Sequence, residues 1–380
     1  MYQTGSHSLL THNGIQVLSN MGIWDKLQPY SHPISNFTLE LSQKVTFKPP
    51  YQLMGVAVGG VENDSNQWLY SVPYAKLFQL LNSDQAISRR TLERASKDGD
   101  EVRVEFNGNF SNNYSSVIVT DHAKNPLIKP NFEKLLGKRN SPIFPSANFN
   151  ISLFCFLSKV YSTRQAIIST VVQRPPNYSE KTLREHWVHG ARFIINPISA
   201  TKLEVIIHYQ LKYPEINNIL PVQLDVAPIL TNFFGETLAA KRAAIYPIIE
   251  QLLEPKKKVT RVVPITFGGK LPRYHDGLVF VGPVKNPNFP FGGLNDGVTL
   301  EECFLLAENL KNKPMEEAAR AMDSSLERKN AWLTKMTNKV VRDSVFDAKP
   351  HGLISRYSII LRYAVLKSFG KIYKKIVKPF

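Results

Sequence analysis

The chain has 380 residues, of which 43% are hydrophobic and 21% charged, values that are typical of a folded globular protein and exclude wholesale disorder. Its two cysteines, Cys155 and Cys303, are too few for a disulfide framework or a zinc site, and both stand in apolar runs that predict buried thiols. The net charge of +16 is unevenly distributed, and no stretch reaches the roughly 18 apolar residues of a membrane-spanning helix.

At this length the chain can bury a large core, and we expect two interlocked lobes. Residues 12–27 predict a helix, because apolar residues recur at helical intervals and Asn13 is placed to cap it. Residues 31–61 alternate apolar and polar side chains and predict extended β structure that ends on glycines. The next stretch, 68–83, predicts a strand that turns into an amphipathic helix.

The middle of the chain is rich in predicted strands. Residues 101–121 predict two strands joined by a polar loop. Helices are predicted between Pro221 and Leu253. Further strands are predicted in residues 151–162, 165–174, 192–199, 202–211 and 259–267.

The histidines do not predict a metal site or a catalytic triad. The four considered, His186, His189, His208 and His275, show no pairing with an acid on a predicted helix that would mark a metal site. The sequence also contains no nucleophile elbow, no phosphate-binding P-loop and no zinc motif. Metal-dependent and hydrolytic chemistry is therefore not predicted.

The segment from Leu278 to Leu310 organises the predicted fold. Residues 278–281 form a short apolar run that suits a buried strand, a loop rich in glycine and proline follows, and apolar residues then recur at helical spacing. Such a loop delivers backbone N–H groups to a helix N-terminus, where electron-rich ligand groups are favoured. For this pattern alone, an ordinary strand-to-helix connection without a ligand is the alternative.

The residue types in this segment carry more specific information than its strand–loop–helix pattern. A motif that reads roughly GDAAHxxxPFGGQGxNxGxxDAxxLAxxL is kept at Pro290, Phe291, Gly292, Gly293, Asn295, Gly297, Glu302, Leu306, Ala307 and Leu310. On these residues the segment resembles the closing flavin-contact motif of the class A FAD-dependent monooxygenases, the superfamily of aromatic hydroxylases and ubiquinone hydroxylases. The resemblance extends over about residues 5–345 and is densest at 278–310.

The resemblance implies an α/β fold, namely the two-lobe flavoprotein fold of the para-hydroxybenzoate-hydroxylase type with C-terminal helices. An incomplete Rossmann-type FAD lobe, whose first βαβ unit is missing, would comprise residues 1–30, 62–130 and 266–325. A β-sheet substrate lobe would comprise residues 31–61 and 131–265, and residues 326–380 would form basic C-terminal helices.

The resemblance also implies which residues contact FAD and substrate. The loop from Pro290 to Gly297 would hold the isoalloxazine, and the implied cofactor contacts are Asp121, Gly282, Pro290, Phe291, Gly292, Gly293, Leu294 and Asn295. The stretch 190–197 is similar to the family's GxGRRFxxYPL strand, which implies substrate contacts at Arg192, Phe193, Asn196 and Pro197. In such enzymes the flavin performs the oxygen chemistry with NAD(P)H as electron donor, and the protein supplies orientation and excludes water.

Three of the four cofactor motifs are missing or altered. Pro283 follows Gly282 where the family has the aspartate that binds the flavin ribitol, and His122 follows Asp121 where the family has a glycine. Lys76 stands in place of an arginine that contacts the cofactor, although a solvated helix residue is the better interpretation of it. No GxGxxG occurs near the beginning, so the sequence is either truncated or has lost its dinucleotide cradle. We therefore expect FAD binding to be weak or lost.

The last residues are strongly basic. Residues 349–380 contain eight lysines and arginines and no acid, a block that suits an anionic membrane, a nucleic acid or water. The apolar stripe of residues 354–378 favours docking on the protein body over a membrane-surface role. We expect a cytoplasmic protein without specific nucleic-acid binding and with weak peripheral membrane contact through Lys371, Lys374, Lys375 and Lys378.

Two functions follow from these observations. The first is an FAD-dependent monooxygenase that hydroxylates or epoxidises a hydrophobic ring substrate with NAD(P)H and O₂, and the intact Pro290–Gly293 stretch favours it. The second is a cofactor-poor, non-catalytic relative or fragment that acts as a binding or scaffold protein, and the altered cofactor motifs favour this alternative.

Overall fold

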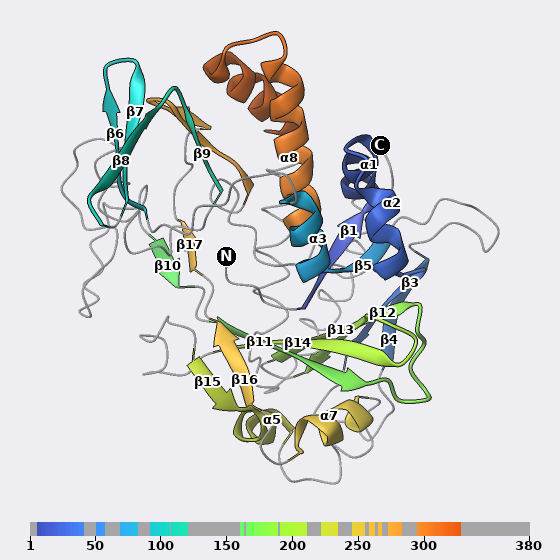
Figure 1. Ribbon diagram of the computed structural model, residues 1–380. Helices are drawn as coiled ribbons and strands as arrows, with labels where there is room; N and C mark the ends of the chain where they lie inside the picture. Colours follow the sequence, from blue (N-terminus) through green and yellow to red (C-terminus); the bar gives the residue numbers. More distant parts are fainter. Residues whose placement is uncertain are drawn as a thin grey trace, which may run out of the picture.

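A mixed arrangement of helices and sheets is present, as predicted (Figure 1). The computed structural model describes residues 6–41, 51–57, 69–82, 92–106, 108–120, 160–162, 165–188, 191–210, 222–234, 245–254, 258–262, 265–267, 273–282 and 295–327. Among the helices in these ranges, none is both long and apolar enough to cross a lipid bilayer.

The largest sheet has eight strands in the order β15-β16-β11-β14-β13-β12-β3-β4. Its paired strands are antiparallel, except that β12 and β3 run parallel with Thr182 opposite Asn36. An early segment of the chain is thereby joined to strands formed about 150 residues later. The strands are β3 (Asn36–Leu41), β4 (Tyr51–Ala57), β11 (Gln165–Gln173), β12 (Thr182–Val188), β13 (Ala191–Pro197), β14 (Lys202–Gln210), β15 (Val222–Asp225) and β16 (Lys258–Val262).

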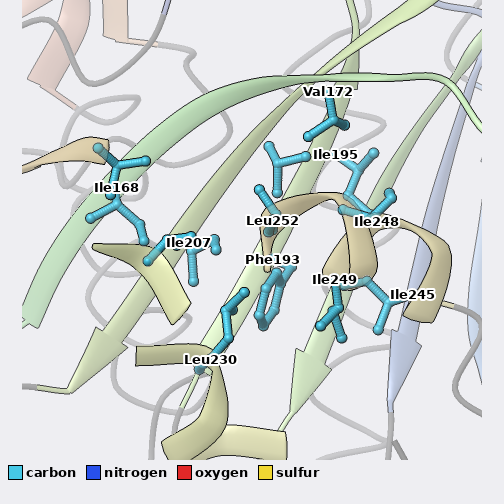
Figure 2. Close-up of a cluster of buried hydrophobic side chains, with 14 of the residues drawn as sticks. Ile168, Val172, Phe193, Ile195, Ile207, Leu230, Ile245, Ile248, Ile249 and Leu252 are labelled. Carbon is cyan, nitrogen blue, oxygen red and sulfur yellow. The ribbon is translucent and has the colours of Figure 1, made fainter. Parts of the chain in front are cut away.

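One face of this large sheet forms an apolar core with two helices, α5 (Val226–Phe234) and α7 (Tyr246–Leu252). Side chains of a strand alternate between the two faces, so every second residue points toward these helices. Burial of each large apolar side chain contributes about 1.5–3 kcal/mol, which makes this cluster a main source of stability. Figure 2 shows its centre, formed by Ile168, Val172, Phe193, Ile195, Ile207, Leu230, Ile245, Ile248, Ile249 and Leu252.

The opposite face of the large sheet is polar although it is also buried. Arg192 lies directly opposite His208 in the register of β13 and β14, and Asn196 lies directly opposite Glu204. All four side chains are at most 1% exposed. We call this surface, with Glu185 of β12, the polar face.

A small sheet of three strands, in the order β1-β5-β2, contacts the polar face through Ser6 and Ser71. Its strands are β1 (His7–Thr11), β5 (Leu69–Pro73) and β2 (His32–Pro33). The helices beside it are α1 (His12–Asn20), α2 (Trp24–Leu27), the 3-10 helix η1 (Gln28–Tyr30) and α3 (Tyr74–Leu81). The prediction of Asn13 as the cap is wrong by two residues: Thr11 precedes α1, because β1 continues into the helix without a loop.

Three further sheets complete the described part of the chain. Of the two strands predicted in residues 101–121, the first corresponds to β7 and the second to β9, which pairs in parallel with β19. The polar loop predicted between them is wrong: it is a strand, β8, that pairs with β7. The strands are β6 (Leu92–Asp98), β7 (Glu101–Phe106), β8 (Phe110–Tyr114), β9 (Val117–Val119), β10 (Val160–Ser162), β17 (Ile265–Phe267), β18 (Tyr274–His275) and β19 (Leu278–Phe280).

The long helix α8 (Asn295–Leu310) is followed by helical residues 315–327, and both pack on β19 through Val279, Leu306 and Met322. In Figure 1, α8 stands beside α1. Cys303 was predicted to be buried, and this is wrong: it lies on the exposed side of α8. Cys155 lies outside the described residues.

Candidate functional site

The first turns of two helices meet next to strand β1. A Cβ atom added to Gly14 of α1 would lie 3.2 Å from the Cα atom of Gly297 of α8, so the close approach of the two helices favours glycine at position 14. Because each glycine is in the first turn of its helix, the two N-termini and their free backbone N–H groups lie close together. The partial positive charges of both helix dipoles therefore add at this place.

A carboxyl group lies at this junction. Asp296 is the second residue of α8, and the hydroxyl group of Ser8 on β1 donates a hydrogen bond of 2.6 Å to its Oδ2 atom. Burial raises the pKa of Asp296, and the hydrogen bond from Ser8 opposes the rise. The pKa of Tyr74 is raised by burial and by the nearby charge of Asp296. The junction therefore contains one acid that is partly withdrawn from water.

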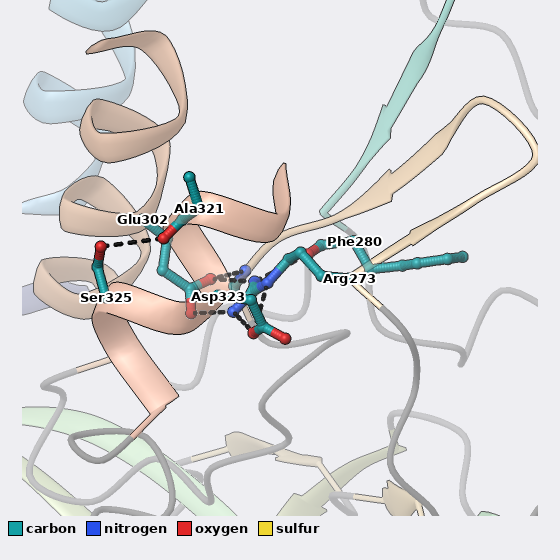
Figure 3. A network of polar contacts seen from close by, with 7 residues as sticks. Arg273, Phe280, Glu302, Ala321, Asp323 and Ser325 are labelled. Atoms are coloured by element: carbon teal, nitrogen blue, oxygen red, sulfur yellow. Dashed lines mark hydrogen bonds and ion pairs between the residues drawn. The ribbon is translucent and has the colours of Figure 1, made fainter. Parts of the chain in front are cut away.

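The end of strand β19 is fixed to α8 by a second acid. The backbone N–H of Gly282 donates to Oε2 of Glu302 at 2.6 Å, and Arg273 donates to both carboxylate oxygens of Glu302 at 3.1 and 3.2 Å (Figure 3). Both side chains of this ion pair are almost completely buried. The pair therefore fixes the point at which the chain leaves β19 for the loop that precedes α8.

Arg273 also joins the helical residues 315–327 to the same strand. Its guanidinium group donates to the carbonyl oxygen of Phe280 at 2.9 Å and to Asp323 at 3.1 Å (Figure 3). The planar guanidinium group suits such a set of partners, because its N–H groups diverge in one plane. One side chain thus connects β19, α8 and the helical segment after α8.

The predicted cofactor residues are placed as follows. Gly282 and Asn295 lie at the two ends of the loop, since Gly282 follows β19 and Asn295 is the first residue of α8. The other predicted contacts lie outside the described residues: Asp121, Pro290, Phe291, Gly292, Gly293 and Leu294. Both ends of the predicted flavin loop therefore lie at α8, since Asn295 begins this helix and Gly282 contacts its residues Thr299 and Glu302.

The four predicted substrate contacts are divided between the two faces of β13. Arg192 and Asn196 lie on the polar face, where Arg192 forms a buried ion pair with Glu185. Phe193 belongs to the apolar core under α7, and Pro197 pairs with Leu203 of that core. Side chains of a strand alternate, so the four residues cannot line one cavity together.

The polar face contains two groups that the sequence did not single out as partners, Glu204 and His208. Burial and the neighbouring Arg192 lower the pKa of His208 well below its ordinary value of 6.5, so this histidine is neutral. Burial raises the pKa of Glu204. In β14, the signal for this face is that Glu204 and His208 stand an even number of positions apart and therefore lie on the same side of the strand.

Lys76 contacts protein groups at the surface. Its ammonium group lies 4.7 Å from the centre of the Tyr30 ring and donates to Gln79 at 3.3 Å. This placement agrees with its interpretation as a solvated helix residue. Within the described ranges, no cluster of three potential metal ligands occurs.

Comparisons with known proteins give the fold of the chain. No protein-family model matches the sequence, and no curated protein matches it. The structure is similar to HpxO of Klebsiella pneumoniae complexed with FAD and uric acid, with a TM-score of 0.67 and 13% identity over 97% of this chain and 84% of that chain. The 2,6-dihydroxypyridine-3-hydroxylase of Arthrobacter nicotinovorans gives a TM-score of 0.63 and 14% identity over 93% and 86% of the two chains.

A third solved structure is that of PqsL of Pseudomonas aeruginosa, a probable FAD-dependent monooxygenase, with a TM-score of 0.57 and 11% identity over 90% of this chain and 87% of that chain. The chain has the fold of the class A FAD-dependent monooxygenases. The predicted two-lobe α/β fold of the para-hydroxybenzoate-hydroxylase type is thereby confirmed. Identities of 11–14% give the fold of this protein, and its activity is a separate question.

Proposed function

We propose that this protein is a flavoprotein monooxygenase that hydroxylates or epoxidises a hydrophobic ring substrate with NAD(P)H and O₂. One observation supports the proposal above all: the first turn of α8 meets β1 and α1, within a fold that this chain shares over 97% of its length with HpxO, a protein solved in complex with FAD. In this arrangement the loop between Gly282 and Asn295 would hold the isoalloxazine. Arg192 and Asn196 would contact the substrate from the polar face.

The described residues fit a flavin ring in part. Backbone N–H groups in the first turn of α8 suit the electron-rich edge of the ring. An ionised Asp296 in the same turn would repel that edge once the ring is reduced, whereas a protonated Asp296 would donate a hydrogen bond to it. Burial raises the pKa of Asp296 and the hydrogen bond from Ser8 opposes the rise, so the protonation of this acid sets how well the site fits the ring.

FAD, when bound, supplies the oxygen-activating chemistry of such enzymes. The residues of this chain would bind and orient: the first turn of α8 positions the ring, and Ser8 holds the carboxyl group of Asp296. The large sheet would exclude water, since its polar face is buried. We expect weak FAD binding, so that the protein purifies colourless.

Titration with FAD, followed by flavin fluorescence, tests the placement of the ring. We expect Asp296→Asn to tighten FAD binding about tenfold, because one negative charge at a helix N-terminus changes the interaction by about 1–2 kcal/mol. Asp25→Asn is the matched control, since Asp25 is an exposed acid in the first turn of α2. Unchanged or weaker FAD binding by Asp296→Asn alone would show that the ring does not lie at α8.

The second candidate is a non-catalytic relative that binds a ligand without turnover. The carboxyl group of Asp296 favours it, because an acid in the first turn of α8 occupies the place of an electron-rich ligand. Oxidation of NAD(P)H with saturating FAD and a set of ring substrates separates the two functions. If neither the wild type nor Asp296→Asn oxidises NAD(P)H faster than free FAD does, the monooxygenase proposal fails and the non-catalytic function stands.

A further inference from the structure

A buried acid connects the small sheet to the large sheet. Glu204 of β14 is 0% exposed and lies on the polar face, directly opposite Asn196 of β13. Two serines of the small sheet reach this place: Ser6, which precedes β1, and Ser71 of β5. This contact lies outside the helix junction at α8, and the inference drawn from it does not depend on FAD.

The hydrogen bonds of Glu204 are confined to one of its two oxygen atoms. Oε1 accepts from the backbone N–H of Ser6, from the Ser6 hydroxyl group at 2.9 Å and from the Ser169 hydroxyl group at 3.1 Å. Oε2 is inaccessible to water and has no hydrogen-bond partner among the described residues. An ionised carboxylate with one such oxygen would lose most of its hydration without replacement.

Asn196 also has a buried oxygen atom without a hydrogen-bond partner among the described residues. Its amide nitrogen donates to the Ser71 hydroxyl group at 2.9 Å, whereas its amide oxygen is buried and has no partner among the described residues. Both unsatisfied atoms, Oε2 of Glu204 and the amide oxygen of Asn196, are acceptors, and their residues face each other across the strand pair. A hydrogen bond between two acceptors requires a proton on one of them, and only the carboxyl group can hold it.

The surroundings of Glu204 contain no cation bonded to it. Its hydrogen-bond partners in the described ranges are neutral side chains and a backbone N–H group. Of the titratable groups on the polar face, Arg192 is paired with Glu185, and His208 is neutral. A buried acid without a cationic partner favours its neutral form.

The titratable groups of the small sheet and of α8 do not change this conclusion. The Ser6 hydroxyl group donates a hydrogen bond to Glu204. It therefore accepts its hydrogen bond with His7, in which Nδ1 of His7 is the donor at 2.8 Å. Burial and the neighbouring His32 lower the pKa of His7 to about 4, which leaves this histidine neutral at pH 7. Asp296 is bonded to Ser8 on β1 and not to Ser6.

We propose that Glu204 is a neutral carboxylic acid at pH 7, whose Oε2–H group donates to the amide oxygen of Asn196, so that one proton joins β14 to β13 beside the hydrogen bonds of Ser6 and Ser71 that connect the two sheets. With this proton in place, each polar atom of the Glu204–Asn196 pair has a partner. Ionisation removes the donor and leaves two acceptors facing each other. The contact between the small and large sheets is therefore sensitive to alkaline pH.

Burial raises the pKa of Glu204, and the hydrogen bonds of its carboxyl group with Ser6, Ser169 and Asn196 oppose the rise. The net upward direction gives the sign of the pH dependence. An unfolded chain releases this proton near the ordinary value of 4.5, whereas the folded protein keeps it to higher pH. Between these two values each unfolding event releases one proton. The ratio of folded to unfolded protein then falls as pH rises, by up to tenfold per pH unit.

Urea unfolding from pH 5 to pH 9 tests the proposal, with Glu204→Gln as the decisive variant. The glutamine amide keeps an acceptor for Ser6 and Ser169 and supplies a permanent N–H donor for Asn196. We expect Glu204→Gln to be more stable than the wild type at pH 7, with an advantage that grows by up to tenfold per pH unit in the folding constant and is smallest at pH 5. Glu254→Gln, at an exposed position after α7, should follow the wild-type curve.

A Glu204→Gln curve that runs parallel to or below the wild type at every pH would overturn the proposal. Glu204 would then be ionised, and the Asn196 amide would have the opposite orientation, with its nitrogen facing Oε2. Infrared spectroscopy gives a second readout that needs no substitution of Glu204. The carbonyl band of a buried protonated carboxylic acid should be present at pH 7 in Asp296→Asn, in which Asp296 cannot supply it, and its absence would also overturn the proposal.

Discussion

At Gly282 the backbone has a φ of +69°, in the left-handed region that favours glycine. A Cβ atom added there would lie 2.9 Å from both Cγ2 and Oγ1 of Thr299 on α8. The resemblance to flavin monooxygenases predicts this glycine as a cofactor contact. In the structure it has a packing role that holds whether or not a flavin is bound.

Gly282→Ala should therefore destabilise the protein for two reasons, a strained backbone and a clash. Gly22→Ala is the matched control, because Gly22 has a φ of +67° and nothing within 4 Å of an added Cβ. We expect backbone strain to lower the free energy of unfolding by about 1–2 kcal/mol in either variant. The clash with Thr299 should lower it by about 1–3 kcal/mol more in Gly282→Ala. Denaturant unfolding measures both variants, and equal losses would show that Thr299 gives way.

Individual residues of the candidate site were predictable only where a motif named them. The motif gave Gly282 and Asn295, which the structure brings to the same helix, α8. It did not give the partnership of Ser8 with Asp296, because these residues are 288 positions apart in the sequence. Their contact depends on the packing of β1 against α8, which the spacing of residues along the chain does not encode.

At the scale of elements, the strands of the large sheet show what alternation can and cannot predict. Three predicted strands, 165–174, 192–199 and 202–211, correspond to β11, β13 and β14, since their apolar residues mark the core face. Strand β12 was not predicted, because its sequence, TLREHWV, places charged residues on both faces. Its pairing with β13 and β3 imposes the extended structure in spite of its composition.

The ion pair between Arg273 and Glu302 should be the main connection between β19 and α8. Glu302→Gln leaves Arg273 charged in a buried place and weakens the acceptor for Gly282. We expect a loss of about 3–5 kcal/mol in the free energy of unfolding, because removal of one partner leaves a buried charge uncompensated. Glu316→Gln is the control, since its pair with Arg320 on the exposed side of residues 315–327 contributes about 0.3–0.5 kcal/mol. Similar losses in the two variants would contradict this role.

At the scale of the whole molecule, the resemblance predicted the fold, although 11–14% identity leaves few residues in common with its structural neighbours. The apolar patterns of strand and helix are enough to specify such a fold, because many side chains fill the same core. The polar face illustrates what the apolar patterns do not predict. Its charges are balanced by ion pairs such as that of Arg192 with Glu185. Such pairs depend on the exact register of neighbouring strands, which a single sequence does not give.

The basic segment 354–378 lies outside the described residues, and two interpretations of its sequence predict opposite results for its deletion. If its apolar stripe docks on the protein body, deletion removes Ile359, Leu366, Phe369 and Tyr373 from contact, each contributing about 1.5–3 kcal/mol. The melting temperature should then fall, or the protein should aggregate. If the stripe lies on a membrane, deletion should leave the melting temperature unchanged and abolish binding to anionic vesicles.

We expect docking, with weak membrane contact through Lys371, Lys374, Lys375 and Lys378. Each lysine near an anionic surface contributes about 1 kcal/mol, so vesicle binding by the full chain should weaken steeply as salt is added. Replacement of these four lysines by glutamine is the matched variant, because it removes the charge and keeps the apolar stripe. This variant should keep the melting temperature of the full chain and lose vesicle binding. An unchanged melting temperature after deletion of the segment would refute docking, and absent vesicle binding by the full chain at low salt would refute membrane contact.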